Sequence, residues 1–125
     1  MGSALVRGLL AGGFDATQIT IVEKDSNQIA ALKNQFSKVV ITTQLPKCDS
    51  IVLAIKPSEV VGVCQTLSAS GAKQILSIAA GVKISTIEKA TGGTVAVVRA
   101  MPNTPALIGQ GASAMSISST CNAEN

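Results

Sequence analysis

Three short segments of this sequence carry residue types that suit the binding of a flat, polar ligand. They read Lys56-Pro57, Ala79-Ala80-Gly81 and Arg99 to Pro105 (RAMPNTP). The alanines and the glycine leave the backbone open to a planar ring, because they have almost no side chain. In the third segment two prolines stiffen the chain around Asn103. Each segment alone also fits a simpler interpretation, namely a strand stop, close packing or a surface turn.

Each of the three segments follows an apolar run that predicts a β-strand. The runs are Ser50 to Ile55, Ile75 to Ile78 and Val95 to Val98. The first is apolar at every position after its serine, as expected for a strand that is buried on both faces. In an open parallel sheet the carboxyl ends of the strands lie along one edge, where ligands bind. We therefore expect the three segments to line one crevice, which is stronger evidence for a site than any segment alone.

Helices and further strands alternate along the rest of the sequence. Helices are predicted from Met1 to the Gly12-Gly13 pair, from Asn27 to Gln35 with Asp25 or Ser26 as cap, from Glu59 to Ala69, and from Ile84 to Lys89 with Ser85 as a possible cap. The remaining strands are predicted at Ile19 to Val22, Val39 to Ile41 and Ala112 to Ile117.

This alternation predicts one α/β domain, Rossmann-like and doubly wound, with a mainly parallel sheet and helices on both faces. The sequence opens on a helix that no strand precedes, so we expect the first strand of the fold to be missing. Aromatic residues make up only 2% of the 125 residues, and the core must therefore be built from Ala, Val, Ile and Leu.

The composition argues against several classes of function. The net charge is only +3, the basic residues do not cluster, and few aromatic side chains could stack on bases, so no nucleic-acid partner is expected. Histidine is absent and Cys48, Cys64 and Cys121 are widely spaced, which argues against a metal site or a disulfide framework. No apolar run has the length of a membrane span, and no signal-peptide pattern opens the chain. We expect a cytoplasmic domain with no metal and no membrane partner.

Hydride transfer is the chemistry that this composition supplies best. Acid–base and nucleophilic catalysis lack a histidine or a carboxylate pair near the three segments. A nicotinamide cofactor carries the difficult chemistry itself and needs mainly orientation from the protein. Its type is read at the end of the second strand, where an acidic residue favours NAD and a basic one NADP. Glu23 and Lys24 are adjacent there, so the residues leave both cofactors open, and an exposed charged loop fits equally well.

Four stretches of the sequence match the motifs of one enzyme family, in order. They are Ala54-Ile55-Lys56-Pro57, Ala79 to Val82, Val97 to Pro105 and Gly109 to Ala112. On these motifs the sequence resembles pyrroline-5-carboxylate reductase, the last enzyme of proline synthesis, over essentially the whole chain. The third stretch is specific to this family within the wider Rossmann superfamily.

The resemblance implies NAD(P)H-dependent reduction of 1-pyrroline-5-carboxylate, a small-molecule substrate, to L-proline. NADP is the implied cofactor, with NAD as the alternative, and the parent protein is implied to be a cytoplasmic homo-oligomer. Residues 1–125 would form a partial NAD(P)-binding domain, because the family's opening strand with its first two glycines and its C-terminal helical dimerisation domain fall outside the sequence. We therefore expect this chain alone to bind NADPH weakly and to have no reductase activity.

Residue by residue, the resemblance also implies contacts to the cofactor. Gly2 corresponds to the third glycine of the family's pyrophosphate motif, Glu23 to the ribose-reading position, and Lys24 to an arginine at the adenosine phosphate. Lys56 is the one candidate catalytic residue, with a structural role as its alternative. The nicotinamide-ribose side of the crevice comprises Ala54, Ile55, Lys56, Pro57, Ala79, Ala80, Gly81, Met101, Pro102 and Asn103.

Two other functions remain open. Another Rossmann imine or β-hydroxyacid reductase would share the crevice but lack the Met-Pro-Asn-Thr-Pro stretch. A non-catalytic, truncated dinucleotide-binding module would fold by pairing with another chain.

Overall fold

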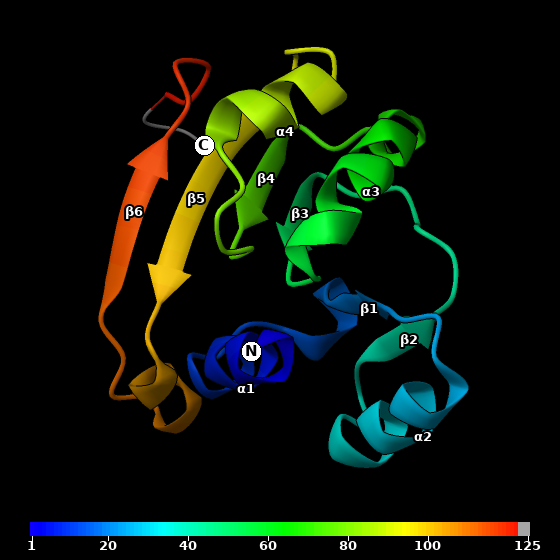
Figure 1. The fold of residues 1–125 in the computed structure, drawn as a ribbon. Helices are drawn as coiled ribbons and strands as arrows, with labels where there is room; N and C mark the ends of the chain where they lie inside the picture. Colours follow the sequence, from blue (N-terminus) through cyan, green and yellow to red (C-terminus); the bar gives the residue numbers. More distant parts are fainter. Residues whose placement is uncertain (123–125) are drawn as a thin grey trace. The chain divides into compact units, whose positions relative to one another are not determined.

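The computed structural model describes residues 1–122, and the chain divides into two compact units. One unit comprises Ser3–Pro46, and the other comprises Met1–Gly2 together with the chain from Lys47 onward. Each unit has its own hydrophobic core and its own sheet. Figure 1 labels the helices and strands.

The smaller unit contains helix α1, strand β1, helix α2 and strand β2. Their bounds are Gly2–Ala11 for α1, Thr20–Val22 for β1, Ser26–Gln35 for α2 and Val40–Thr42 for β2. The two strands are parallel and pair Thr20 with Val40. Asp25 caps α2, because its carboxylate accepts hydrogen bonds from the N–H groups of Asn27 (2.8 Å) and Gln28 (3.2 Å). These elements confirm the predicted helices and strands of this region to within one residue, apart from the end of α1.

The core of the smaller unit is centred on one aromatic ring. Phe36 is 5% exposed and packs with Leu32 and Val39, which are also buried. Partly buried side chains surround them, and these are Val6, Leu10, Ala16, Ile19, Ile21 and Ile41. The apolar stripe of α2 therefore faces the two strands, as its helical spacing requires.

The larger unit holds a four-stranded sheet in the order β3-β4-β5-β6. The bounds are Ser50–Leu53 for β3, Gln74–Ser77 for β4, Ala96–Pro102 for β5 and Ser113–Ile117 for β6. The first three strands are parallel, and β6 runs antiparallel to β5. Helix α3 (Val60–Thr66) follows β3, and helix α4 (Ile84–Ala90) follows β4. This is the βαβ connectivity that the sequence predicted, and the Rossmann-like α/β class is confirmed.

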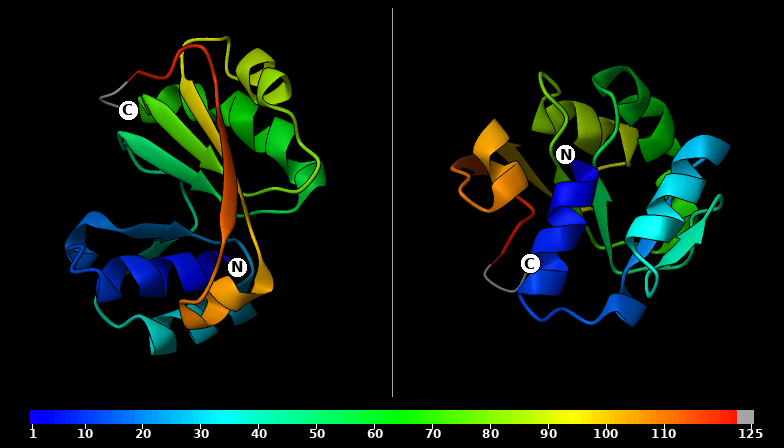
Figure 2. Two further views of the ribbon diagram at one scale, coloured as in Figure 1. Left: turned by 90° about the vertical axis from the view of Figure 1, so that its left-hand side faces the viewer. Right: turned by 90° about the horizontal axis from the view of Figure 1, so that it is seen from below.

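Both helices of the larger unit lie on one face of its sheet (Figures 1 and 2). Ile51, Ile75 and Val97 are paired neighbours across β3, β4 and β5, and all three side chains are buried under the helices. From the helices, Val60 and Ile87 complete this core with 0% of their side chains exposed. The prediction of helices on both faces of the sheet stays a prediction.

The prediction that the Ser50-to-Ile55 strand is buried on both faces is wrong. In β3 the buried residues Ile51 and Leu53 alternate with the exposed residues Ser50 and Val52. The strand is therefore amphipathic by position although its sequence is apolar. Val52 shares its row with Leu76, Val98 and Ile117, and Ile117 is 64% exposed.

Three other predictions need correction. Strand β5 runs to Pro102 and does not end at Val98, because β6 pairs with it from Val98 to Pro102. Ser85 does not cap α4, since the helix begins one residue earlier and the capping position belongs to Lys83. The predicted 59–69 helix is a short α-helix between two 3₁₀ turns, Pro57–Glu59 and Leu67–Ser70.

The structure also has two sheets where the sequence predicted one. Among the described residues, β1 pairs only with β2, and β3 pairs only with β4. One edge of β1 and one edge of β3 therefore have no described strand beside them. In this part of the chain, no helix is both long and apolar enough to cross a membrane.

Truncating Ile87 tests whether the α4–sheet core holds the larger unit together. Ile87→Ala is expected to lower the free energy of unfolding by about 3 kcal/mol, because it leaves a cavity in a fully buried position. The matched control Ile117→Ala, at an exposed position, is expected to lower it by less than about 1 kcal/mol. Urea unfolding followed by far-UV circular dichroism measures both, and equal losses would contradict the described core.

Candidate functional site

The carboxyl ends of β3, β4 and β5 lie at one edge of the larger unit's sheet (Figure 1). Because the three strands are parallel neighbours, the segments that follow them are spaced by about 5 Å per strand. These segments are Ala54–Pro57 after β3, Ala79–Gly81 after β4 and Asn103 after β5. The structure therefore brings the sequence-predicted segments to one edge, while their roles in binding stay predictions.

At the end of β3, Gly2 lies directly against Ala54, and both residues belong to the larger unit. A Cβ atom placed on Gly2 would lie 3.1 Å from the Cβ of Ala54, which is tighter than nearly all real contacts of this kind. The helix start can approach the strand this closely because Gly2 has no side chain. This is the close helix–strand packing that the last glycine of a dinucleotide-binding turn provides.

Lys56 follows on the same side with an exposed side chain. Its backbone is fixed, since its N–H donates to Glu59 Oε2 (3.3 Å) and its carbonyl accepts from the Glu59 N–H (2.9 Å). Pro57 begins the 3₁₀ turn between them. The Lys56 ammonium makes no ion pair with any residue that the structure describes. The preceding residue, Ile55, packs its side chain against the core and leaves only its backbone for a ligand.

The end of β4 exposes backbone. The Ser77 side chain is 0% exposed, and its hydroxyl accepts a hydrogen bond from the Ala79 N–H (3.4 Å). Ala79 is itself buried, whereas Ala80 and Gly81 are exposed. Gly81 has a φ of +73°, a backbone conformation that residues other than glycine rarely adopt. A planar ring could therefore reach Ala80 and Gly81, as the sequence predicted, but it could not reach the buried side chain of Ala79.

The end of β5 is held by Asn103. Its Oδ1 accepts from the Ala112 N–H (3.0 Å), and its own N–H donates to the Ala112 carbonyl (3.2 Å). Asn103 thus closes the loop between β5 and β6, a structural role for its side-chain oxygen that the sequence did not reveal. Of the neighbouring predicted contacts, Met101 is 43% exposed and Pro102 is partly buried.

Glu23 and Lys24 lie at the end of β1 in the smaller unit. Glu23 Oε1 accepts hydrogen bonds from the N–H groups of Lys24 (2.7 Å) and Asp25 (3.0 Å). Since Asp25 caps α2, both carboxylates of this loop are bound to backbone amides. Lys24 is exposed, and its ammonium has no ion pair with a described residue. Glu23 and Lys24 therefore differ in availability, because the Glu23 carboxylate is already bound to backbone amides and the Lys24 ammonium has no ion pair with a described residue.

The cysteines lie outside this edge. Cys64 is 1% exposed in the core, and burial raises the pKa of its thiol. Burial is also the main cause that raises the pKa of the Cys48 thiol. Neither environment favours a reactive thiolate. Within the described chain, no three histidine, cysteine or acidic residues are close enough to hold a metal ion.

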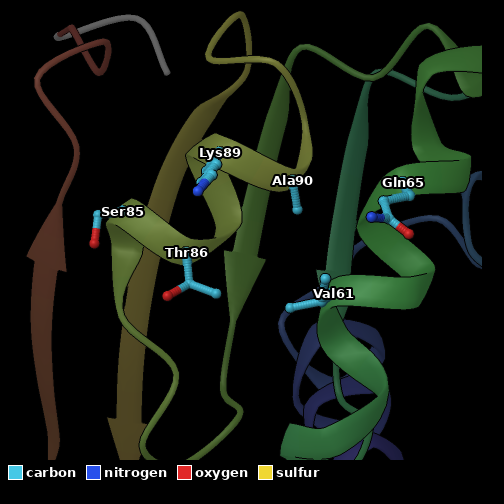
Figure 3. A pocket seen from close by; sticks show the side chains of 6 residues that line it. All are labelled: Val61, Gln65, Ser85, Thr86, Lys89 and Ala90. Atoms are coloured by element: carbon cyan, nitrogen blue, oxygen red, sulfur yellow. The ribbon is translucent and has the colours of Figure 1, made fainter.

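A separate groove of about 620 Å³ lies between α3 and α4. Figure 3 shows its lining, which consists of Val61, Gln65, Ser85, Thr86, Lys89 and Ala90. None of these residues belongs to the three strand-end segments, so the groove is not part of the candidate site.

A sequence model for the family described as NADP oxidoreductase, coenzyme F420-dependent, matches residues 1–81. The chain belongs to this family. The residues that the NADP oxidoreductase model matches include Gly2, Lys56 and Gly81, and they end before β5.

Individual relatives extend the likeness beyond that point. Pyrroline-5-carboxylate reductase from Pseudomonas aeruginosa is 37% identical over 120 residues, which is 92% of this chain and 44% of the relative. The same enzyme from Escherichia coli is 34% identical over 117 residues, which is 89% of this chain and 44% of the relative. The resemblance to this enzyme family is confirmed.

Solved structures agree with these relatives. A pyrroline-5-carboxylate reductase from Coxiella burnetii superposes with a TM-score of 0.89 at 31% identity, over 98% of this chain and 48% of that one. The Plasmodium falciparum enzyme, solved with NADP bound, gives 0.74 at 25% identity, over 99% of this chain and 47% of that one. The chain spans less than half the length of each of these four proteins.

Two residues of the larger unit stand out to which the sequence assigned no role of their own. A Cβ atom on Gly111 would lie 2.6 Å from the Cβ of Ala106, so only glycine fits where the loop after β5 closes. Arg99 has a buried Nε atom without a hydrogen-bond partner. The sequence signal that could have singled out Arg99 is its position, because it is a charged residue two positions after the core residue Val97 in the same strand.

Enlarging Gly2 tests its close contact with Ala54 at the end of β3. Gly2→Val is expected to lower the free energy of unfolding by about 1–3 kcal/mol, because the new side chain clashes with Ala54. Gly8→Val, on the same helix where nothing lies within 4 Å, is expected to change it by less than about 0.5 kcal/mol. Urea titration of both variants measures the difference, and equal effects would argue against the close approach.

Proposed function

We propose that this chain is the dinucleotide-binding part of an NADPH-dependent pyrroline-5-carboxylate reductase, which reduces 1-pyrroline-5-carboxylate to L-proline. The likeness to the Coxiella enzyme over 98% of the chain, at a TM-score of 0.89, carries this proposal. The continued likeness of 34–37% identity across β5 supports it over the broader family alone.

The residues at the sheet edge fit a dinucleotide. The first amides of α1 have no partner within the helix and would bind the pyrophosphate at the positive end of this ten-residue helix, where Gly2 lies close to Ala54. Ala80 and Gly81 offer exposed backbone to the nicotinamide-ribose end. We assign the same end to Ala54, Ile55, Lys56, Pro57, Ala79, Met101, Pro102 and Asn103. When bound, NADPH supplies the hydride that reduces the imine carbon.

Lys56 is the proposed catalytic residue. Its ammonium is exposed at the carboxyl edge, and it is not neutralised by any described carboxylate. An imine nitrogen takes up a proton when its carbon is reduced, and Lys56 Nζ would hold that proton. The bond between Glu59 and the Lys56 backbone fixes where the side chain starts.

NADP is the proposed cofactor in preference to NAD. Glu23 would have to release two backbone amides before it could bind ribose hydroxyls, because its Oε1 accepts from both Lys24 and Asp25. The Lys24 ammonium is exposed and unpaired, so it suits the additional phosphate of NADP.

The remaining parts of the proposal concern the whole protein. We propose that it is a cytoplasmic homo-oligomer, and that residues 1–125 supply a partial NAD(P)-binding domain. Much of the substrate pocket and the dimer contacts would then lie in the portion of the relatives that this chain does not match, which is 56% of the Pseudomonas enzyme.

An assay of proline formation tests the function. The protein encoded by the complete reading frame is expected to form L-proline from 1-pyrroline-5-carboxylate and NADPH, and Lys56→Met is expected to lower kcat by about 100-fold. The 125-residue chain alone is expected to form no proline. Reduction of a different imine or of a β-hydroxyacid substrate, with no proline formed, would contradict the proposal.

Replacing Lys24 tests the cofactor preference. Lys24→Ala is expected to raise the Kd for NADPH about tenfold or more and to leave the Kd for NADH unchanged, because only NADPH carries the phosphate that Lys24 binds. Lys38→Ala, an exposed lysine of the same unit, is expected to change neither Kd. Fluorescence titration of the reduced cofactors measures both constants, and equal loss for the two cofactors would contradict the assignment.

A further inference from the structure

Gln44, in the loop after β2, has an exposed side chain to which no role has been assigned. Strands β1 and β2 are parallel, and their last paired residues are Val22 and Thr42. The Glu23 N–H donates to the Thr42 carbonyl (3.0 Å), so the pairing holds up to the point where both strands end. Lys24 and Gln44 each lie two residues beyond that pair, and neighbouring strands are spaced by about 5 Å. The two loops therefore leave the smaller unit's sheet side by side.

Hydrogen bonds to the backbone hold both loops and leave the two side chains free. The Gln44 N–H donates to Thr42 Oγ1 (3.2 Å), and the Lys24 N–H donates to Glu23 Oε1 (2.7 Å). Neither the side-chain amide of Gln44 nor the ammonium of Lys24 has a hydrogen bond or an ion pair with a described residue. Both side chains are exposed, so a ligand from solution can reach them. This end of the sheet thus presents a cation and an amide on neighbouring, fixed backbones.

The charges around Lys24 favour a second donor for any phosphate that binds there. The acidic residues Glu23 and Asp25 flank Lys24 in the chain, so one ammonium lies among two acidic side chains. Lys33, in the last turn of α2, and Lys38, before β2, lie toward the opposite edge of the sheet and supply no cation here. The additional donor is therefore expected from the neighbouring loop.

The side-chain amide of Gln44 fits the phosphate that distinguishes NADP from NAD. Its Nε2 atom carries two N–H donors, and hydrogen bonds to an ionised acceptor are stronger than those to a neutral one. The Lys24 ammonium binds a phosphate as a point charge and does not by itself fix the phosphate oxygens. An amide on the next strand binds the oxygens that the ammonium leaves open. The ribose of NAD has a neutral hydroxyl in place of this phosphate, and it gains less from such a donor.

We propose that Gln44 donates its side-chain amide to the adenosine phosphate of NADPH, beside Lys24, and thereby contributes to the preference for NADPH over NADH. The proposal rests on the proposed function and adds to it a specificity-determining residue after β2. Gln44 takes no part in the transfer of the hydride or the proton.

Fluorescence titration of both reduced cofactors, on the protein encoded by the complete reading frame, tests this role. Gln44→Ala is expected to raise the Kd for NADPH about fivefold and to leave the Kd for NADH unchanged, because only NADPH carries the phosphate. Gln44→Glu is expected to raise the Kd for NADPH about tenfold or more, since a carboxylate of the same length replaces the donor. Combined with Lys24→Ala, Gln44→Ala is expected to raise this Kd by less than the product of the two single effects, because both residues act on one phosphate.

The matched control is Gln35→Ala, which removes an exposed glutamine at the far end of α2 and is expected to change neither Kd. The Tm of ligand-free Gln44→Ala is expected to equal that of the unmodified protein, because the side chain has no described partner.

Three results would overturn the inference. An unchanged Kd for NADPH in Gln44→Ala would exclude a contact with the cofactor, an equal rise for NADH would assign Gln44 to the ribose or the adenine, and a clearly lower Tm would show a structural role. A protein in which Gln44→Ala weakens NADPH alone, but which forms no proline, would support the inference and overturn the proposed reaction. Proline formation without any dependence of the Kd on Gln44 would do the reverse.

Discussion

The parallel pairing of β3, β4 and β5 in a single register is the constraint on which the candidate site depends. Ile51, Ile75 and Val97 are neighbours in that register, and their burial under α3 and α4 supplies the apolar contact that fixes it. A shift of one residue in any strand would turn its buried side chains away from the helices. Because the core fixes the register, it also fixes which residues emerge at the carboxyl edge, and in what order.

Small residues do three different jobs at that edge. Gly2 permits a close contact with Ala54, Gly81 permits a backbone conformation with positive φ, and Gly111 permits a loop to close on Ala106. The three glycines therefore meet three different constraints, which are a close contact, a dihedral angle and a turn. The edge can therefore present backbone to a ligand only because side chains have been removed for separate reasons.

The sequence predicted the positions of the helices and strands well, but it predicted poorly which strands pair and which faces are buried. Apolar runs such as that from Ile75 to Ile78 located the strands, since strand periodicity is a local property. The length of β5 could not be read in this way, because it depends on pairing with β6, and the bare face of β3 depends on which helices are present. Among the candidate residues, residue types indicated Glu23 and Asn103, but not that their oxygens are already bound to backbone N–H groups. Those bonds arise from the conformation of the loops, which composition does not encode.

The positions of the charged residues suggest a physical reason why the lysines near the candidate site have no ion pair. Lys24 and Lys56 each lie just after the carboxyl end of a strand, and neither of them has an ion pair within the described chain. An intramolecular carboxylate at any of these positions would satisfy the cation, and it would also compete with an anionic ligand for the same donors. A protein that binds an anionic ligand must keep such donors free, and the ligand-free state is then less stable than it could be. The acidic residues follow the same logic, because Glu23, Asp25 and Glu59 are each bound to backbone amides. Negative charge is thereby used to shape the loops, while positive charge is left available to the ligand.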